Sequence, residues 1–406
     1  MKNKYRKYIR LIHLWLGLAS GLVVFIIAVT GCILAFEHEI KHYTQPWQYV
    51  QQEDKPFLLP SQLRAIAEQR IYGDSAGYPG KQITAVQYCG SKKAAIVTYS
   101  QSKAGVTLLY MNPYNGTVQK EKILNNDFFR IVLGIHFYLL LPPDIGRPLV
   151  ASSILIFVVL LISGMILWWP RRWNKKSFKQ GYTIKRGASF KRTNYDLHNV
   201  LGFYSLFFTL ILALTGLVWG FEWYEKGLYK ITSGGKTLEK LKRPLSDTTS
   251  NTALYQHPED VLFLQAAKQH DLSDARFQLT LPAKSSDPFT TNYNPSQSTY
   301  YKREFRYYDR NSLQELKGEG IYAKAYKEAT AADKLYRMNY DIHVGAIAGL
   351  AGKILAFFAS LVAASLPVTG FLIWWGKRKK AVQQKKIQPQ KNIVSPDVEL
   401  EPAFAK

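Results

Sequence analysis

The stretch LIHLWLGLASG, residues 11–21, opens the first apolar segment of a 406-residue chain and places a histidine, His13, in its first turn. The stretch DLHNVLGFYSL, residues 196–206, opens a later apolar segment in the same way, with His198. Laid over each other without gaps, residues 13–37 and 198–222 share ten identical positions, among them His, Thr, Gly, Phe and Glu residues. Apolar bias does not readily supply those residue types in register, so the sequence indicates an internal repeat.

The apolar residues are concentrated in four segments that contain no Asp, Glu, Lys or Arg. These segments are residues 11–36, 148–169, 197–221 and 354–376. At about 1.5 Å of rise per helical residue, each can cross a hydrocarbon core of about 30 Å. The sequence therefore predicts a four-helix transmembrane bundle.

One alternative for the first segment is that it is removed. VTGC, residues 29–32, follows a basic start and an apolar run and resembles a lipoprotein cleavage site. The same Thr and Gly recur in the third segment, where cleavage has no purpose, so we favour a retained helix. The two cysteines, Cys32 and Cys89, are too few for a cysteine-based metal site or a disulfide framework.

The basic residues predict the orientation of the bundle. They gather before the first segment, between the second and third, and after the fourth, and they make up much of the net charge of +24. By the positive-inside rule these parts are cytoplasmic, with both termini inside and the long polar stretches outside. Tryptophans at the ends of the second and fourth segments fit an interfacial belt: Trp168, Trp169, Trp173, Trp374 and Trp375. Because the charge is explained by topology, we expect no nucleic-acid partner.

The second and fourth segments are also similar, ending in LISGMILWWPRR (161–172) and LPVTGFLIWWGKR (366–378). Before each lies a further matched histidine, His136 in FRIVLGIHF and His343 in YRMNYDIHV. The repeating unit is thus a helix, an outer domain, a short His-bearing segment and a second helix, used twice in one orientation. We expect two parallel repeats that pack about an axis along the membrane normal.

The outer stretches carry weaker signals of small α+β domains. Residues 60–70 and 259–270 predict helices, residues 82–88 and 94–99 predict strands, and residues 107–119 and 304–316 each predict a strand, a turn and a strand. Residues 281–301 resemble an insertion without a counterpart in the first half. The chain therefore divides into two similar halves. The first half has the N-terminus and first span (1–37), an outer domain (38–128), and a His-bearing segment with the second span (129–170). A basic cytoplasmic loop (171–195) leads to the third span (196–222), a second outer domain (223–335), a His-bearing segment with the fourth span (336–376), and a basic tail (377–406) expected to be disordered.

The four repeated histidines predict a cofactor. His13 and His198 lie at the cytoplasmic face, His136 and His343 near the outer face, and each pair can converge on the repeat axis. Two imidazoles that meet inside a bundle are the axial ligands of a b-type haem, so we expect two haems. Small residues one or two turns inward leave room for a macrocycle: Gly17, Gly21, Gly202, Ser20 and Ser205. Basic residues near the pairs are candidate partners of the haem propionates: Arg10, Arg130, Arg337, Arg147 and Lys353.

The alternative for these histidines is a capping or packing role that the repeat preserved. His38 and His42, which have no counterpart in the second half, are weaker candidates for a site at the outer face. Phosphate-binding glycine loops, nucleophile elbows and flavin or nicotinamide domains find no support in the sequence. Any electrons must therefore come from another protein or molecule.

These residues resemble the PepSY-associated transmembrane family, also described as iron-regulated membrane proteins, and in particular its inner-membrane ferric-siderophore reductases. The resemblance covers about residues 5–380 and is strongest in IHLWLGLASG, DLHNVLGFYS, TGLVWGFEW, LGIHF and ISGMILWW. The outer domains match the PepSY pattern mainly around Asn112–Gly116 and Asp309–Ser312. The resemblance implies two b-type haems, a periplasmic ferric siderophore as substrate, and a cytoplasmic flavoprotein or quinol as electron donor.

The predicted function is that of a haem-dependent oxidoreductase in the bacterial inner membrane. It would reduce ferric iron in a siderophore on the periplasmic side and release Fe(II). Two other functions remain open at this point. One is a haem-free binding or regulatory protein that uses its PepSY-like domains, and the other is a transporter of the siderophore itself.

Overall fold

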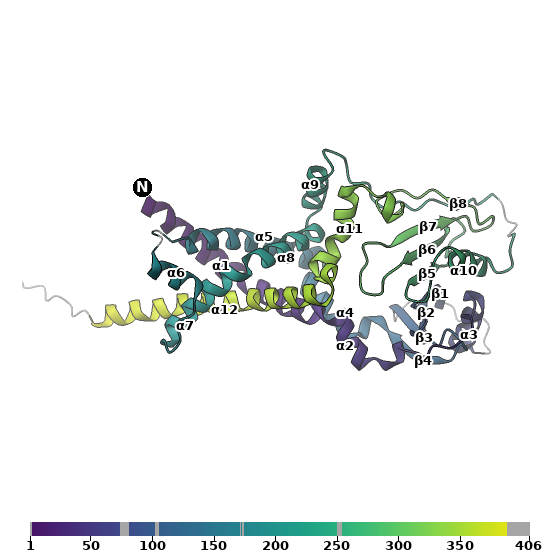
Figure 1. Ribbon diagram of the computed structural model, residues 1–406, viewed down its shortest axis with the longest axis horizontal. Helices are drawn as coiled ribbons and strands as arrows, with labels where there is room; N and C mark the ends of the chain where they lie inside the picture. Colours follow the sequence, from purple (N-terminus) through teal and green to yellow (C-terminus); the bar gives the residue numbers. More distant parts are fainter. Residues whose placement is uncertain are drawn as a thin grey trace, which may run out of the picture.

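The computed structural model describes residues 2–73, 81–101, 105–170, 172, 174–249 and 254–387. A bundle of long helices forms one end of the molecule and an antiparallel sheet the other, with short helices between them (Figure 1). Arg171, Trp173 and the part of the predicted tail beyond residue 387 lie outside the described residues.

Four helices within the described residues are long and apolar enough to cross a membrane, as predicted. They are α1 (Lys2–Ala35), α5 (Pro143–Trp168), α8 (Gly202–Gly220) and α12 (Gly349–Ile387). The third span begins earlier, because α7 (Phe190–Asp196) and the π-helical turn η3 (Leu197–Leu201) run directly into α8. Helix α1 contacts α5 and α12, and α8 contacts the same two helices, so α1 and α8 lie diagonally opposite.

The middle of the bundle is filled by apolar side chains from all four helices. The buried members of this cluster are Val24, Ala28, Phe157, Leu161, Ala213, Ala363 and Ala364. The alanines allow the helices to approach closely, which is how helices associate in a membrane. This packed layer separates the interior of one end of the bundle from that of the other.

The predicted cytoplasmic parts lie together at the end of the bundle away from the sheet. This end holds the N-terminus, α6 (Lys175–Tyr182), α7 and the last turns of α12 (Figure 1). Helix α12 continues to Ile387, so residues 377–387 are helical, in contrast to the disordered tail expected from residue 377 onwards.

The two outer stretches form one continuous sheet of eight strands, where the sequence indicated two separate small domains. The order is β4-β3-β2-β1-β5-β6-β7-β8, and β1 pairs antiparallel with β5 through Val86 opposite Leu279. The strands are β1 (Lys81–Tyr88), β2 (Ala95–Gln101), β3 (Gly105–Met111), β4 (Val118–Ile123), β5 (Arg276–Thr280), β6 (Phe289–Asn294), β7 (Glu304–Tyr308) and β8 (Glu315–Leu316).

The description of residues 281–301 as an insertion without a counterpart was wrong. This stretch contains β6, which lies next to β5 as β2 lies next to β1. Each outer stretch therefore contributes four strands, arranged in chain order from the centre of the sheet outwards.

Two helices, α3 (Pro60–Tyr72) and α10 (Pro258–Gln269), pack on the sheet and join its two parts. The carboxylate of Asp260 accepts hydrogen bonds from the backbone N–H of Ser61 at 2.8 Å and from its hydroxyl at 2.5 Å. A carboxylate is favourable there because the first turn of a helix has unpaired N–H groups. Arg64 also pairs with the buried Glu259 at 2.8 Å.

Four short helices connect the bundle to the sheet: α2 (Glu37–Thr44), α4 (Phe128–Tyr138), α9 (Glu222–Thr232) and α11 (Ala331–His343). The single-turn 3₁₀ helices are η1 (Pro46–Gln48), η2 (Leu124–Asn126), η4 (Tyr326–Glu328) and η5 (Ala346–Ala348). Helix α4 contacts α1 and α5, and α11 contacts α8. The two His-bearing segments are thus helices that dock on the ends of the spans.

Two glycines fix these segments against the helices that follow them. A Cβ on Gly146 would lie 2.1 Å from the backbone oxygen of Tyr138, and a Cβ on Gly352 would lie 2.1 Å from the backbone oxygen of Gly345. No side chain fits at either place, because the obstacle is backbone that cannot rotate away. The starts of α5 and α12 therefore touch the chain just after His136 and His343.

We expect Gly146→Ala and Gly352→Ala each to lower the free energy of unfolding by about 1–3 kcal/mol, the usual cost of forcing extra atoms into a packed site. The measurement is the thermal unfolding midpoint of the detergent-solubilised protein. Gly227→Ala in α9 is the matched control, since a Cβ there meets nothing within 4 Å. An unchanged midpoint for both tight sites would contradict the close backbone contact.

Candidate functional site

The structure brings together the inner pair of predicted histidines. His13 projects from α1 and His198 from the π-helical turn η3, on diagonally opposite spans. Their ring centroids are 6.4 Å apart and their planes are nearly perpendicular, at 89°. The pair lies at the end of the bundle away from the sheet.

The outer pair has nearly the same geometry. His136 lies near the end of α4 and His343 ends α11, with ring centroids 6.3 Å apart and an angle of 64° between the planes. His13 and Thr30, the latter in contact with His136, are seventeen residues apart on α1, which is about 25 Å along a helix. Two similar sites therefore lie one above the other, with the apolar cluster between them.

Each imidazole is held through Nδ1 by a hydroxyl from a neighbouring helix. Nδ1 of His13 lies 2.8 Å from Ser163 Oγ in α5, and Nδ1 of His198 lies 2.9 Å from Thr369 Oγ1 in α12. For the outer pair the partners are Thr30 Oγ1 in α1, 3.0 Å from His136, and Thr215 Oγ1 in α8, 2.9 Å from His343. All four rings are thus oriented by the same kind of contact.

The direction of these hydrogen bonds follows from the hydroxyl protons. Thr215 donates its proton to the backbone oxygen of Ile211 at 2.6 Å, and the other three hydroxyls donate to backbone oxygens of their own helices in the same way. A hydroxyl has one proton, so its oxygen must accept from the ring. These hydrogen bonds assign the ring proton of each of the four histidines to Nδ1, which leaves the lone pair on Nε2.

The outer rings are also neutral. Burial lowers the pKa of His136 to about 4 and that of His343 to about 3. At pH 7 both imidazoles therefore lack the second proton, and Nε2 is free to bind a metal.

A glycine follows each of these hydroxyl residues and makes room for the ring. A Cβ on Gly31, Gly164, Gly216 or Gly370 would lie 3.3–3.4 Å from Cε1 of His136, His13, His343 and His198, respectively. The sequence contains this signal as four hydroxyl–Gly pairs, TG, SG, TG and TG, one in each span. Sequence reasoning noted two of them but did not connect them with the histidines.

The predicted propionate partners have varied positions. Arg10, Arg130 and Arg147 are exposed at the ends of helices, whereas Lys353 is buried and bonds Glu39 at 2.7 Å. Arg337 is directed elsewhere, in contrast to the prediction. Its side chain is 1% exposed, donates to the backbone oxygens of Arg303 and Lys324, and lies over the rings of Tyr322 and Tyr326.

The small residues predicted to leave room for the haem macrocycle differ in what they contact. Ser20 donates to the backbone oxygen of Leu16, and Ser205 Oγ is buried without a hydrogen-bond partner. The two weaker candidates for a site at the outer face lie on α2: His38 is partly exposed, and the ring of His42 packs against Tyr43 and Tyr49. Neither joins the histidine pairs.

The comparison with protein families gives one finding. The sequence pattern of the family described as PepSY-associated TM region matches residues 10–377, which includes most of the four spans and the whole sheet. No curated protein matches the chain.

Removing one hydroxyl should release its imidazole. We expect Thr215→Val to lower the free energy of unfolding by about 0.5–1.5 kcal/mol, because the ring of His343 loses the hydroxyl acceptor and keeps only the backbone oxygen of Leu212. Thr215→Ser keeps the hydroxyl and should recover most of this loss. Chemical unfolding of the two variants checks the prediction, and equal losses for Val and Ser would mean that Thr215 acts only through its methyl group.

Proposed function

The chain belongs to the PepSY-associated TM region family, and we propose that it is a di-haem electron-transfer protein that reduces a ferric siderophore outside the bacterial inner membrane. His13 and His198 would hold the inner b-type haem, and His136 and His343 the outer one. The function is that of an oxidoreductase, a ferric-siderophore reductase.

The observation that carries this proposal is the spacing of the rings. An imidazole nitrogen binds a first-row metal at about 2.0 Å and the ring centre lies about 1.2 Å behind it, so rings on opposite sides of one ion have centroids about 6.4 Å apart. The two pairs have centroid distances of 6.4 and 6.3 Å. Both pairs thus fit a single ion bound from two sides.

The donor set fits a haem in particular. Each pair supplies two imidazoles with the proton on Nδ1, and within the described parts of the chain no His, Cys, Asp or Glu completes a cluster of three. Two imidazole nitrogens would suit a metal whose remaining ligands come from a macrocycle. The four hydroxyls fix ring orientation and raise ligand basicity.

A bound haem would supply a one-electron Fe(III)/Fe(II) couple at each site. The residues of this chain hold the two sites at fixed depths, since α1 carries both His13 and Thr30 and α8 follows His198 and carries Thr215. The apolar cluster around Phe157 keeps water out of the layer between them. Low polarity there favours transfer between fixed sites over leakage to solvent.

We attribute the matching geometry of the two halves to the parallel repeat. Each half has a span with a histidine at the inner end and a Thr-Gly pair at the outer end, and a second span with a hydroxyl–Gly pair near its inner end. The four-strand halves of the sheet follow the same order from its centre. A two-fold axis between the halves would pass through both histidine pairs.

The siderophore and the electron donor are taken from the family resemblance. Reduction weakens the hold of hard oxygen ligands, because Fe(II) carries less charge and is softer than Fe(III). The positive-inside rule assigns the basic ends of the bundle to the cytoplasm, where a flavoprotein or quinol would deliver electrons, and the sheet to the periplasm.

The alternatives explain less of the structure. A haem-free regulatory protein would have no use for four half-buried imidazoles held in one tautomer. A transporter with broken helices is the other alternative, but α12 runs without a break through Pro367.

The test is the absorption spectrum of the full-length protein, purified from haem-replete cells in detergent, before and after dithionite. We expect the Soret and α bands of a low-spin b-type haem, with about two haems per chain. His13→Ala and His343→Ala should each remove about half of the haem. His257 lies beside helix α10 on the sheet, so His257→Ala should remove none.

Two results would refute the proposal in different ways. A colourless protein would exclude haem binding altogether. Loss of both haems from either single variant, with an unchanged unfolding midpoint, would mean that the ligands are not paired as His13 with His198 and His136 with His343.

The proposed orientation can be tested separately with reporter fusions. A green fluorescent protein fused after residue 387 should fluoresce, because this protein matures in the cytoplasm. Alkaline phosphatase fused after residue 240 should be active, because its disulfides form in the periplasm. The opposite pattern would reverse the direction of electron transfer.

A further inference from the structure

We propose that the junction between the sheet and the bundle binds a polyanionic ligand at a cation cluster formed by Lys93, Arg276 and Lys353. This inference rests on the proposed function for the identity of the ligand, a negatively charged ferric chelate. It specifies the substrate class, because neutral and cationic chelates would gain little from such a site.

The three cations come from three different parts of the fold. Lys93 lies in the turn between β1 and β2, and Arg276 is the first residue of β5, so each half of the sheet supplies one. Lys353 lies near the start of α12, so the bundle supplies the third cation. His38 of α2 lies within electrostatic range of all three. No single element would gather these charges, and only the folded chain brings them together.

The two sheet cations share one neutral oxygen. Gln297 Oε1 accepts from Arg276 Nε at 3.1 Å and from Lys93 Nζ at 3.4 Å. The amide is oriented for this contact, because its Nε2 donates to the backbone oxygens of Cys89 at 2.8 Å and Ala275 at 2.9 Å. Arg276 also donates to Tyr300 Oη at 2.6 Å. These contacts hold both charges in place without neutralising them.

The cluster has too little negative charge. Among the residues that the structure describes, neither Lys93 nor Arg276 forms an ion pair, and Lys353 pairs only with Glu39. Burial, followed by the positive charges of Lys93 and Lys353, lowers the pKa of His38, and burial together with Arg276 lowers the pKa of Lys93. Partly buried cations that repel one another are costly, so an anion that binds between them is strongly favoured.

Aromatic rings connect the cluster to the outer histidine pair. The guanidinium of Arg276 lies 5.1 Å from the ring of Tyr300, which contacts Tyr340 at 5.3 Å between centroids. Tyr340 in turn contacts Trp219 at 6.4 Å, and Trp219 contacts His343 at 5.2 Å. A ligand at the cluster therefore lies beside the outer site, with Tyr340, 44% exposed, at the boundary.

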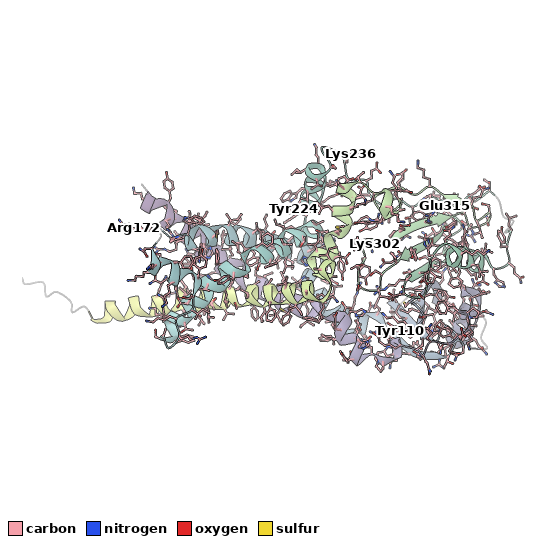
Figure 2. All side chains as sticks on the ribbon, in the orientation of Figure 1. Tyr110, Arg172, Tyr224, Lys236, Lys302 and Glu315 are labelled. Atoms are coloured by element: carbon pink, nitrogen blue, oxygen red, sulfur yellow. The ribbon has the colours of Figure 1, made fainter. Side chains whose placement is uncertain are left out.

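The loop that carries Tyr300 is tied to the helix that carries His343. The carboxylate of Asp341 accepts from the backbone N–H of Tyr300 at 3.0 Å and of Tyr301 at 2.8 Å. Lys302, the next residue but one after Tyr300, lies between the sheet and α11 in Figure 2. The ligand site and the outer histidine pair are thus parts of one rigid arrangement.

The charge of the cluster selects among ferric chelates. A tris-catecholate or carboxylate complex of Fe(III) is negatively charged and would be attracted, whereas a trihydroxamate complex is neutral or positive. Reduction would add one electron to the bound Fe(III), supplied ultimately by the cytoplasmic flavoprotein or quinol, and no covalent bond in the protein would change. Phospholipid headgroups are the other anions at this depth, but Lys93 and Arg276 belong to the sheet, beyond the ends of the spans.

The experiment measures binding of a gallium(III) tris-catecholate chelate to the full-length protein in nanodiscs of neutral lipid, by calorimetry. Gallium(III) has the size and charge of Fe(III) but is not reduced, so binding is read without electron transfer. We expect saturable binding that weakens as salt is raised. Lys93→Gln and Arg276→Gln should each weaken it about tenfold or more, Arg276→Lys should recover part of the loss, and the exposed Lys268→Gln on α10 should have no effect.

Three results would overturn the inference. These are equal affinity for a gallium trihydroxamate, unchanged affinity in Lys93→Gln and Arg276→Gln with unchanged unfolding midpoints, or loss of chelate binding when anionic lipid is added to the nanodisc. The last would assign the cluster to a headgroup. A haem-free protein that still binds the chelate would refute only the proposed electron transfer, and a di-haem protein that does not bind it would refute only the cation site.

Discussion

The hydrogen bond from an imidazole Nδ1–H to a hydroxyl of a neighbouring helix occurs four times, and the arrangement of the bundle depends on it. Each bond joins two different elements: α1 to α5, η3 to α12, α4 to α1 and α11 to α8. The same contact orients a ring, sets its tautomer and ties neighbouring helices together. An unpaired ring nitrogen or hydroxyl would be costly at this depth, so the stable packing of the helices is also the packing that keeps the proton on Nδ1 and the lone pair on Nε2.

The sheet supplies the second constraint, because it determines how α4 and α11 meet. Each of these helices follows one half of the sheet in the chain, and the halves are joined through β1 and β5 and through the bonds between Ser61 and Asp260. His136 and His343 therefore converge only when the sheet is complete. The inner pair, by contrast, depends only on the spans themselves, so the two sites have different structural requirements.

The histidine pairs could be predicted from the sequence, because a repeat with matched orientation implies an axis, and His13/His198 and His136/His343 recur as potential metal ligands. The four hydroxyl–Gly pairs were equally visible, but the two in the first and third spans were noted only as a possible cleavage site and its counterpart. The orientation of the Arg337 side chain could not be predicted, because the spacing of residues along a helix gives no information on its contacts with Tyr322 and Tyr326. Strand β6, with the polar sequence FTTNYN, lacks apolar alternation and is a strand because its neighbours β5 and β7 pair with it.

The pairing of β1 with β5 also has a consequence for biosynthesis. Val86 leaves the ribosome long before its partner Leu279, and two membrane spans are made in between. Until then β1 is an edge strand with unpaired N–H and C=O groups, the kind of edge that recruits other chains. The first half of the protein therefore needs protection from aggregation while the second half is synthesised, and a truncated product would expose β1 as an unpaired edge strand. The risk of aggregation through β1 ends when β5 pairs with it.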